Sequence, residues 1–380
     1  MRICSPHCGI DPETTSGGET YERELLKHLA ARGIVFDLLL ARHKRYPEGV
    51  PSWVIHRLPI RRGLRWPVAA LLLPPFIKRI HDLTRFDLLR VHSLRFIGPA
   101  ALWARRRYRL DVPVVAHHHH LDPSWLNPWI EGQVMRGVER IVVGSEFSRR
   151  QAGRELGVPA EKMSVVYYGV DPRFRPAPKP EALVQRWSLA GRPVALFLGG
   201  LKERKNLPFL LDVWSDVVRE RAESRLVLAG SGPLAELLRR QAARLGLDRH
   251  VIFAGYVPER EKVDYYNLAD AVLFPSFMEG FGLTVAEAMS CELPVVASDR
   301  GSLPELVSEG EGGFLCDPSD RARFVERTLL LLSDPGMRAK FGAANRQRVD
   351  RMFRWSHCAD GTKRVYEEVL DEWYRRRVAS

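Results

Sequence analysis

Residues Pro275–Met289, with the sequence PSFMEGFGLTVAEAM, decide the predicted fold of this chain. The run before them, Ala271–Phe274, is short and apolar, as expected for a buried parallel strand. Gly280 and Gly282 permit a sharp backbone turn and the close approach of a ligand. The helical pattern then begins near Thr284. The stretch therefore predicts a strand, a glycine-rich turn and a helix, which is how parallel α/β sheets are built.

Two glutamates lie eight residues apart across this turn, Glu279 in the loop and Glu287 inside the helix. The unpaired amides and the positive dipole end of a helix N-terminus favour an anion. A ligand with a central diphosphate and hydroxyl-rich sugars at both ends, such as a nucleotide sugar, would suit this layout. A structural alternative exists, because Thr284 and Glu287 have the spacing of a capping box, in which the glutamate only bonds the helix start.

The composition is that of a soluble globular protein, with 45% hydrophobic and 27% charged residues. A length of 380 residues is sufficient for two domains. No apolar run approaches the length of about 18 residues expected of a transmembrane helix, and the first residues predict a strand rather than a signal peptide. The five cysteines are scattered without a Cys-x-x-Cys pair. This pattern favours a reducing compartment and argues against a disulfide scaffold or a zinc ribbon.

The net charge of +12 is concentrated in the first half of the chain. Residues 1–175 carry 28 Lys and Arg against 17 Asp and Glu, whereas residues 176–380 are nearly neutral. The cations cluster within residues 57–65, 78–79 and 105–109. Such a surface favours an acidic partner, which could be anionic lipid, an acidic glycan or nucleic acid. The alternative is a solvated basic face without a dedicated partner.

Short apolar runs alternate with amphipathic stretches along the chain, which predicts parallel sheets with helices on both faces. The pattern breaks at the proline-rich, charged segment 171–192, which we interpret as a linker between domains 1–170 and 193–354. A long helical region is predicted from about residue 319 to residue 377. The predicted strands are 2–4, 36–40, 53–58, 88–92, 112–116, 140–144 and 164–168, followed by 193–198, 225–229, 251–254, 271–274, 294–297 and 313–315.

The Glu279 and Glu287 pair resembles the Glu-x7-Glu motif of retaining glycosyltransferases, in particular glycosyltransferase family 4. In that family the first glutamate meets the donor sugar and the second meets the nucleotide ribose. The resemblance covers nearly the whole chain and is strongest in residues 193–318. It implies the α/β GT-B architecture, in which two Rossmann-like doubly wound parallel-sheet domains face an interdomain cleft. It also implies that a helix at 355–377 returns to pack on the first domain.

The turn Gly199–Leu207, at the start of the second domain, joins a strand to a helix and carries three cations. A metal-independent transferase must neutralise the departing diphosphate with fixed cations and amides. We assign this role to Lys205, with Arg204 or Lys202 assisting. Family members commonly carry an arginine where this chain has Gly200. Either Arg204 supplies the missing charge, or one contact to the diphosphate is absent.

The other donor-binding candidates act through their backbone. Gly17 and Gly18 lie at the start of the first helix, where bare amides could hold a phosphate or a sugar, although a tight turn would explain them equally well. In relatives, the position of Val257 lies near the nucleotide base. The helix start in the second domain offers the amides of Gly280, Phe281, Gly282 and Leu283.

Four consecutive histidines, His117–His120, end the strand predicted at 112–116. Relatives have one histidine here, near the hydroxyl groups of the donor sugar, and the register from Pro113 favours His119, then His118 and His117. The competing interpretation is a metal site. Adjacent residues on an extended chain point alternately, so at most two of these histidines could share one ion. No partnering Cys or His cluster stands out elsewhere, and we predict no metal site.

The sequence thus predicts a retaining, metal-independent glycosyltransferase that uses no cofactor. It would transfer a hexose from a UDP- or GDP-sugar to a hydroxyl group of a lipid-linked or polysaccharide acceptor in cell-surface glycan biosynthesis. The predicted catalytic residues are His119, Lys205 and Glu279, and His92 is a candidate for the acceptor side.

We expect the protein to be cytoplasmic, with peripheral binding at the inner face of the cell membrane. The stretch Arg57–Lys78 mixes arginines with Trp66, Leu71–Leu73 and Phe76, which is typical of a segment that lies at a membrane surface. An amphipathic helix packed on the sheet is the alternative.

Two other classes of protein fit less well. An NAD-dependent oxidoreductase needs a Gly-x-Gly-x-x-Gly turn with an acidic residue about 20 positions further on, and no turn here satisfies that pattern. A nucleic-acid-binding protein would account for the positive charge, but the chain has no recognisable module and no basic stripe interleaved with aromatic residues. We therefore expect no nucleic-acid partner.

Overall fold

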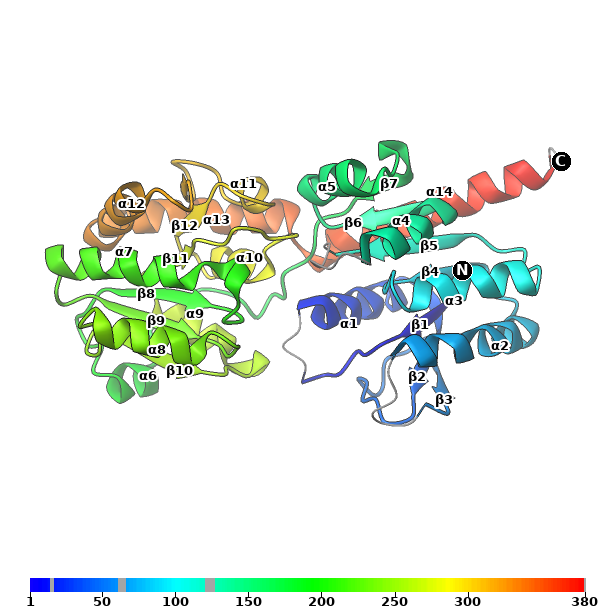
Figure 1. Cartoon of the computed structure of the whole chain (residues 1–380), viewed down its shortest axis with the longest axis horizontal. Coiled ribbons are helices and arrows are strands. Elements are labelled where there is room, and N and C mark those ends of the chain that lie inside the picture. The colour runs from blue at the N-terminus through cyan, green and yellow to red at the C-terminus, as the bar shows by residue number, and fades with distance from the viewer. Residues whose placement is uncertain (14–16, 61–65, 120–126, 379–380) are drawn as a thin grey trace. The chain divides into compact units, whose positions relative to one another are not determined.

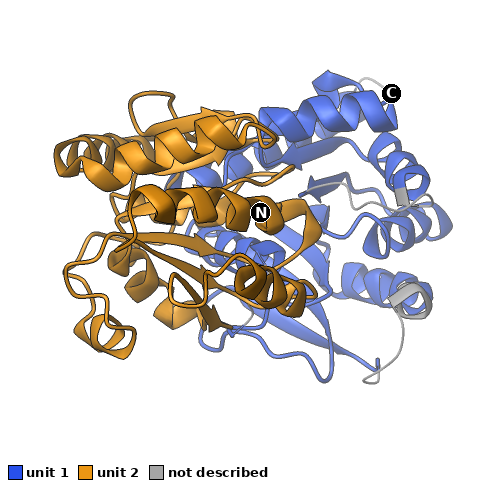
Figure 2. Cartoon of the chain, turned by 60° about the vertical axis from the view of Figure 1, so that its left-hand side comes forward, with its two compact units in different colours: residues 1–169, 355–380 blue, residues 170–354 orange. Residues whose placement is uncertain are grey.

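The structure is a computed structural model that describes residues 1–13, 17–60, 66–119 and 127–378. It divides the chain into two compact units (Figure 1, Figure 2). Unit 1 contains Met1–Gly169 and Trp355–Ser380, and unit 2 contains Val170–Arg354. The chain therefore builds most of unit 1, then all of unit 2, and returns to unit 1 for its last helix.

Unit 1 is built on a parallel sheet of seven strands among the described residues, in the order β3-β2-β1-β4-β5-β6-β7. Helices α1 and α14 pack together on one face (Figure 1). On the other face α2 packs against α3, α3 against α4, and α4 against α5. The strands are β1 (Arg2–His7), β2 (Val35–Ala41), β3 (Trp53–Leu58), β4 (Leu88–Val91), β5 (Val114–His118), β6 (Arg140–Val143) and β7 (Met163–Val165). The helices are α1 (Gly17–Ala30), α2 (Trp66–Thr84), α3 (Ile97–Arg107), α4 (Asn127–Gly137), α5 (Glu146–Leu156), the 3₁₀ turn η1 (Ala160–Lys162) and α14 (Trp355–Val378).

Unit 2 repeats this plan with a six-stranded parallel sheet in the order β10-β9-β8-β11-β12-β13. Helix α7 packs between α8 and α12, and α10 packs against α13. The strands are β8 (Val194–Leu198), β9 (Arg225–Ala229), β10 (Val251–Gly255), β11 (Ala271–Phe274), β12 (Val295–Ser298) and β13 (Gly313–Cys316). The helices are α6 (Glu181–Arg186), η2 (Glu203–Lys205), α7 (Leu207–Glu220), α8 (Ala235–Arg244), η3 (Glu259–Glu261), α9 (Lys262–Leu268), α10 (Leu283–Ser290), α11 (Leu303–Leu306), α12 (Arg321–Ser333) and α13 (Pro335–Met352).

The predicted α/β class with two doubly wound parallel sheets is confirmed, and each predicted strand is present with small shifts at its ends. The apolar runs are strands because both faces of each sheet are covered, so a run such as Ala271–Phe274 is fully buried. The helical region predicted at 319–377 consists of the three helices α12, α13 and α14. Asp334 interrupts it, because its side chain accepts a hydrogen bond from the amide of Met337 (2.8 Å) and Pro335 begins α13.

The segment 171–192, which the sequence predicts as a linker, is part of unit 2. The Phe174 side chain is only 2% exposed and meets Tyr266 edge to face, with ring centroids 5.7 Å apart. The amide of Ala177 donates to the side chain of Asn267 (2.7 Å). Proline and charge indicate an extended, exposed chain, but two or three apolar side chains in such a segment are enough to fix it on a neighbouring surface.

Helix α14 returns to unit 1, where it packs beside α1 (Figure 1). The buried hydroxyl of Tyr366 accepts a hydrogen bond from Nε of Arg90 (2.9 Å) on β4. At the surface, Arg32 pairs with Asp360 (2.6 Å) on this helix. None of the described helices has both the length and the apolar character needed to cross a membrane.

The turns that follow β8 and β9 cross at very short range. A Cβ atom on Gly230 would lie 1.8 Å from the carbonyl oxygen of Gly199, and Gly230 has φ +148°. The amide of Leu201 donates to the carbonyl of Ser231 (2.9 Å). Only glycine permits this crossing, which fixes the start of the loop that carries Lys205.

We expect Gly230→Ala to lower the free energy of unfolding by more than about 3 kcal/mol, because one backbone must move to admit the methyl group. Urea unfolding measures this change. Gly246→Ala is the matched control, because Gly246 has φ +70° but no neighbouring atom within 4 Å of the added carbon, and it should cost about 1–2 kcal/mol. Equal effects of the two changes would show that the crossing imposes no steric limit.

Candidate functional site

The best-defined candidate site lies where the strand order of unit 2 reverses, between β8 and β11. The chain connections run in opposite directions from such a point, and ligands of doubly wound sheets bind there, beyond the carboxyl ends of the strands. The loop after β8 carries η2, and the loop after β11 carries Glu279. The amide of Phe277 donates to the carbonyl of Arg204 (2.8 Å), so the two loops are joined directly.

Glu279 forms ion pairs with two of the predicted cations. Its Oε1 contacts Nζ of Lys205, and its Oε2 accepts a hydrogen bond from Nη1 of Arg204 (2.9 Å). Glu279 and Lys205 are 5% and 6% exposed, whereas Arg204 reaches further toward solvent. The structure thus brings together three of the residues that the sequence predicts, and it places Arg204 beside Lys205 although Gly200 carries no charge.

The backbone of Glu279 is held as firmly as its side chain. Its carbonyl accepts hydrogen bonds from the amide and the hydroxyl of Ser302, both 3.0 Å long. Gly301, with φ +64°, lies so close that a Cβ there would come within 2.6 Å of the amide of Glu279. The carboxylate is therefore presented from a rigid loop, as a preorganised contact requires.

The ion pair remains charged over a wide pH range. Burial alone would raise the pKa of Glu279, but Lys205 and Arg204 outweigh it and lower that pKa to about 2. Burial lowers the pKa of Lys205, and Glu279 opposes that effect. The site holds two cations against one carboxylate, so it is suited to an anionic ligand.

Glu287 belongs to a second cluster, further along α10. It is 2% exposed, and its Oε2 accepts a hydrogen bond from the hydroxyl of Tyr266 (2.7 Å). Nζ of Lys262 lies 3.5 Å from both of its carboxylate oxygens. The helix begins after Gly282 (φ +92°) and has no side-chain cap. The capping-box alternative for Glu287 is therefore wrong, because this carboxylate faces α9 and not the first turn of its own helix.

The predicted backbone contacts lie at strand ends as expected, and their roles stay predictions. Gly17 begins α1 with open space around it, while Ser16, which precedes it, lies outside the described residues. Val257, after β10, is 5% exposed. At the start of α10 the amides of Val285 and Ala286 donate to the carbonyl of Gly282, so Leu283 and Thr284 carry the amides that a helix start leaves outside its own hydrogen bonding.

The histidine run alternates in direction along the end of β5. His117 is buried, with Nδ1 3.2 Å from the hydroxyl of Tyr21 and Nε2 2.8 Å from that of Tyr366. His119 is partly exposed, with Nδ1 2.6 Å from the hydroxyl of Tyr168 and Nε2 3.2 Å from Oε1 of Glu22. His118 is 4% exposed, and His120 lies outside the described residues. The structure thus places His119 in a hydrogen-bonded network of unit 1.

Glu22 is the centre of this network. Its Oε2 pairs with Nη1 of Arg90 (2.5 Å), and both side chains are buried. Burial disfavours the carboxylate, but Arg90, together with the hydrogen bond from His119, holds the pKa of Glu22 well below its ordinary value. Through Tyr366 the same network reaches α14, so one buried ion pair ties together α1, β4, β5 and the last helix.

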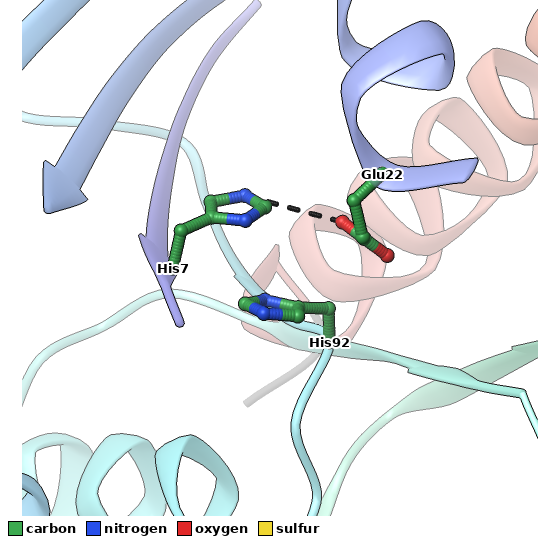
Figure 3. Close-up of side chains that lie close together, drawn as sticks. All are labelled: His7, Glu22 and His92. Carbon is green, nitrogen blue, oxygen red and sulfur yellow. Dashed lines mark ion pairs between the residues drawn. The ribbon is translucent and has the colours of Figure 1, made fainter. Parts of the chain in front are cut away.

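One group of described residues has the spacing of metal ligands: His7, Glu22 and His92, with candidate atoms within 4.8 Å of one another. Figure 3 shows His7 and His92 stacked, with His7 paired to Glu22. The ring centroids lie 4.2 Å apart and the planes differ by 17°. The in-plane lone pairs of stacked rings do not converge on one point, and Arg90 and His119 already occupy the Glu22 oxygens. These residues therefore fit a metal ion poorly.

Several residues of these clusters were not identified from the sequence. Glu22 and Arg90 lie in ordinary amphipathic and apolar patterns, and nothing local marks them as partners. Tyr266 and Lys262 are four residues apart, so they share one face of α9, but the sequence does not show that this face meets Glu287.

The chain matches two family models, "Glycosyltransferase Family 4" over residues 15–174 and "Glycosyl transferases group 1" over residues 181–348. Solved structures with the same fold include sucrose-phosphate synthase from Thermosynechococcus elongatus, with a TM-score of 0.80, 22% identity and coverage of 98% of this chain and 100% of that chain. Anabaena HepE in complex with UDP-glucose gives a TM-score of 0.79 at 20% identity, covering 97% of this chain and 100% of that chain.

The fold is that of GT-B glycosyltransferases, and the chain belongs to glycosyltransferase family 4. Similar curated proteins include D-inositol 3-phosphate glycosyltransferase of Streptomyces bingchenggensis, 32% identical over 65% of this chain and 56% of that protein. Another is the GDP-mannose-dependent alpha-(1-6)-phosphatidylinositol monomannoside mannosyltransferase of Mycolicibacterium smegmatis, 28% identical over 77% of this chain and 81% of that protein. The matched region thus spans little more than half of the first relative.

We expect Glu279→Gln to destabilise unit 2 at neutral pH by roughly 3 kcal/mol, because it leaves buried Lys205 without a charged partner. The folded-state pKa is about 2, below the unfolded value. The stabilisation by the ionised carboxylate is therefore present above the unfolded pKa of about 4.3 and is lost as the pH falls toward 2.

Urea unfolding of the wild type and the variant from neutral pH down to about pH 3 checks this expectation, because the difference should shrink on acidification. Glu236→Gln, which removes an exposed pair with Arg240, serves as the control and should change little. A difference that is the same at every pH would show that ionisation of Glu279 does not stabilise the fold.

Proposed function

We propose that this protein is a retaining glycosyltransferase that moves a hexose from a UDP- or GDP-sugar to a hydroxyl group of a lipid-linked or polysaccharide acceptor in cell-surface glycan biosynthesis. The observation that carries the proposal is the pairing of Glu279 with Lys205 and Arg204 at the strand reversal of unit 2. Such a site supplies both the cations that a diphosphate needs and the carboxylate that a sugar hydroxyl needs.

When the donor binds, Lys205, Arg204 and Glu279 would exchange their contacts with one another for contacts with the donor. The diphosphate takes the cations of Lys205 and Arg204, aided by the first amides of α10. Hydroxyl groups of the hexose then donate hydrogen bonds to the carboxylate of Glu279. Until the donor binds, the carboxylate pairs with both cations, so no isolated charge has to be buried in the free protein.

In the transfer step, the bond between the anomeric carbon and the diphosphate oxygen breaks, and the acceptor oxygen bonds to that carbon. The acceptor proton passes to the departing phosphate oxygen, on the same face of the sugar, which gives retention. Lys205 and its neighbours stabilise the charge that develops on the leaving group. The proposal uses no covalent nucleophile, metal ion or cofactor.

His119 is proposed to contact the hydroxyl groups of the donor sugar. Both of its ring nitrogens have partners within unit 1, Tyr168 and Glu22. Contact with a sugar therefore requires His119 to exchange one of these hydrogen bonds. An exchange of one hydrogen bond for another costs little net free energy.

Relatives support both candidate bases and a lipid acceptor. One is named as GDP-mannose-dependent and acts on a phosphatidylinositol mannoside, another is an O-antigen chain mannosyltransferase, and HepE was solved with UDP-glucose. We therefore include mannose and glucose as donor sugars. The acceptor would be bound by unit 1, where His92 directly follows β4.

Wild-type protein should be stabilised against thermal unfolding by UDP or GDP, and EDTA should not alter the effect. Glu279→Ala and Lys205→Ala should each slow transfer about a hundredfold or more, because each removes a preorganised contact. Turnover is measured with radiolabelled donor. Lys179→Ala, which removes a surface lysine paired with Asp270, is the matched control. Near-normal turnover in either site variant removes that residue from the site, and stabilisation by NAD alone would contradict the proposal.

Peripheral membrane binding is proposed for the surface formed by α2 and α3, which pack against each other in unit 1. Leu71 and Leu83 on α2 are 66% and 68% exposed, and Trp103 on α3 is 49% exposed. The cations Arg79 and Arg106 are exposed on the same two helices. Apolar and basic side chains together favour an anionic lipid surface.

The structure corrects the residues expected at this surface. Leu73 is 1% exposed and Phe76 packs against the core, so these two side chains face the sheet instead of solvent. Leu71 and Leu72 remain exposed. Arg61, Arg62 and Arg65 lie outside the described residues, as does the side chain of Trp66.

We expect the protein to co-sediment with phosphatidylglycerol vesicles at low salt and to be released at high salt. The double variant Leu71→Ser, Leu72→Ser should weaken binding severalfold, because two exposed apolar side chains are lost. Leu237→Ser, at a 50% exposed leucine of unit 2, is the control. Absence of binding to anionic vesicles at low salt would exclude membrane association through this surface.

A further inference from the structure

The second charge cluster of unit 2 contains two buried carboxylates that share one buried lysine. Glu287, Glu259 and Lys262 are 2%, 8% and 7% exposed. Nζ of Lys262 lies 2.7 Å from Oε2 of Glu259 and 3.5 Å from the oxygens of Glu287. Lys262 is thus the nearest cation to Glu287, but its closer partner is the other carboxylate.

Groups from each neighbouring element face Glu287. Helix α9 contributes Lys262 and Tyr266, η3 contributes Glu259, and the segment before α6 contributes Arg173, which pairs with Glu259. Cys291 directly follows the helix that carries Glu287, and burial raises its pKa to about 12, so it stays a neutral thiol. Lys262 and Arg173 are the cations among these described groups, and Arg173 already neutralises Glu259.

The ionisation of Glu287 depends on this balance. Burial raises its pKa most strongly and the like charge of Glu259 raises it further, while Lys262 and the hydroxyl of Tyr266 oppose them. The net direction is upward even with Lys262 in place. Loss of the lysine would leave two adjacent buried carboxylates, and the pKa of Glu287 would rise further.

The charge of Glu287 matters for a ribose ligand. An ionised carboxylate accepts hydrogen bonds on both oxygens and can take both vicinal hydroxyls of a ribose, whereas a protonated carboxyl must use one oxygen as a donor. Tyr266 already occupies one lone pair of Oε2. Protonation would thus turn one of the two oxygens into a donor and weaken the paired contact with two ribose hydroxyls.

We propose that Lys262 is a positioning residue for donor binding, which holds Glu287 as a carboxylate so that it accepts both ribose hydroxyls of the nucleoside diphosphate. The inference rests on the proposed function, in which Glu287 meets the ribose. It assigns to α9 a role in recognition through charge, without contact between Lys262 and the sugar. It further predicts that Lys262 confers tolerance of donor binding to mild acid.

The test is calorimetric titration of UDP and GDP into the wild type and variants between about pH 5 and pH 8.5, because a raised carboxyl pKa takes effect at the acid end of this range. The terminal phosphate of the probe titrates in this range, so each variant is compared with the wild type in the same buffer. Lys262→Met should raise the Kd several times more at the acid end than at the alkaline end, by about tenfold against about twofold. Lys262→Arg should restore the wild-type dependence of the Kd on pH.

Glu259→Gln should have the opposite effect on the Kd. It removes the like charge beside Glu287 and should strengthen binding at the acid end of the pH range relative to the wild type. Lys179→Met controls for the loss of one positive charge from unit 2. Circular dichroism checks folding, and if Lys262→Met does not fold, Lys262→Arg and Glu259→Gln still decide the matter.

The outcomes separate this inference from the proposed function. A wild type that binds neither nucleoside diphosphate overturns both. If the wild type binds and the Kd of Lys262→Met changes with pH in parallel to that of the wild type, the role of Lys262 alone is overturned. A Glu259→Gln profile that moves in the same direction as that of Lys262→Met also contradicts it, since the two changes alter the charge around Glu287 in opposite senses.

Discussion

The reversal of strand order within a parallel sheet is the constraint on which the candidate site depends. In unit 2, β8 and β11 are neighbours although β9 and β10 lie between them in sequence. The loops that leave these two strands therefore meet at one edge, although 74 residues separate Lys205 from Glu279. No local preference creates this contact. It follows from right-handed crossovers that begin in both directions from β8, the first strand of unit 2. The close crossing at Gly230 then fixes where the loop that carries Lys205 begins.

Buried charge is arranged in small, nearly neutral groups in both units. Glu279 has two cations, Glu22 has Arg90 and a hydrogen-bonding histidine, and Glu287 shares Lys262 with a second carboxylate. An unpaired buried charge would cost several kcal/mol. The groups differ in what a ligand could gain from them. The first has excess positive charge suited to a diphosphate, the second ties α14 to the sheet of unit 1, and the third presents carboxylate oxygens that can accept hydrogen bonds from hydroxyl groups.

Much of the fold and part of the site could be predicted from the sequence. The strands were identified because fully buried strands read as continuous apolar runs, and Glu279, Lys205 and Arg204 because glycine-rich turns after strands mark ligand-facing loops. The histidine run was harder to interpret. Spacing shows that alternate residues share a side. The tyrosines that bond His117 and His119 come from α1, α14 and the segment after β7, so these contacts could not be predicted from the sequence. Lys262 and Glu22 were missed for the same reason.

The sequence by itself determined the class of the protein: two parallel α/β domains, a Glu-x7-Glu turn and a cationic loop, all of which depend on local periodicity and on glycine. The tertiary structure decided which charges meet. It showed that Arg204 stands beside Lys205, that Glu287 faces α9 instead of capping α10, that 171–192 belongs to unit 2 and that Leu73 faces the core. Each of these depends on side chains far apart in the chain, and burial turns such encounters into strong interactions because water no longer screens them.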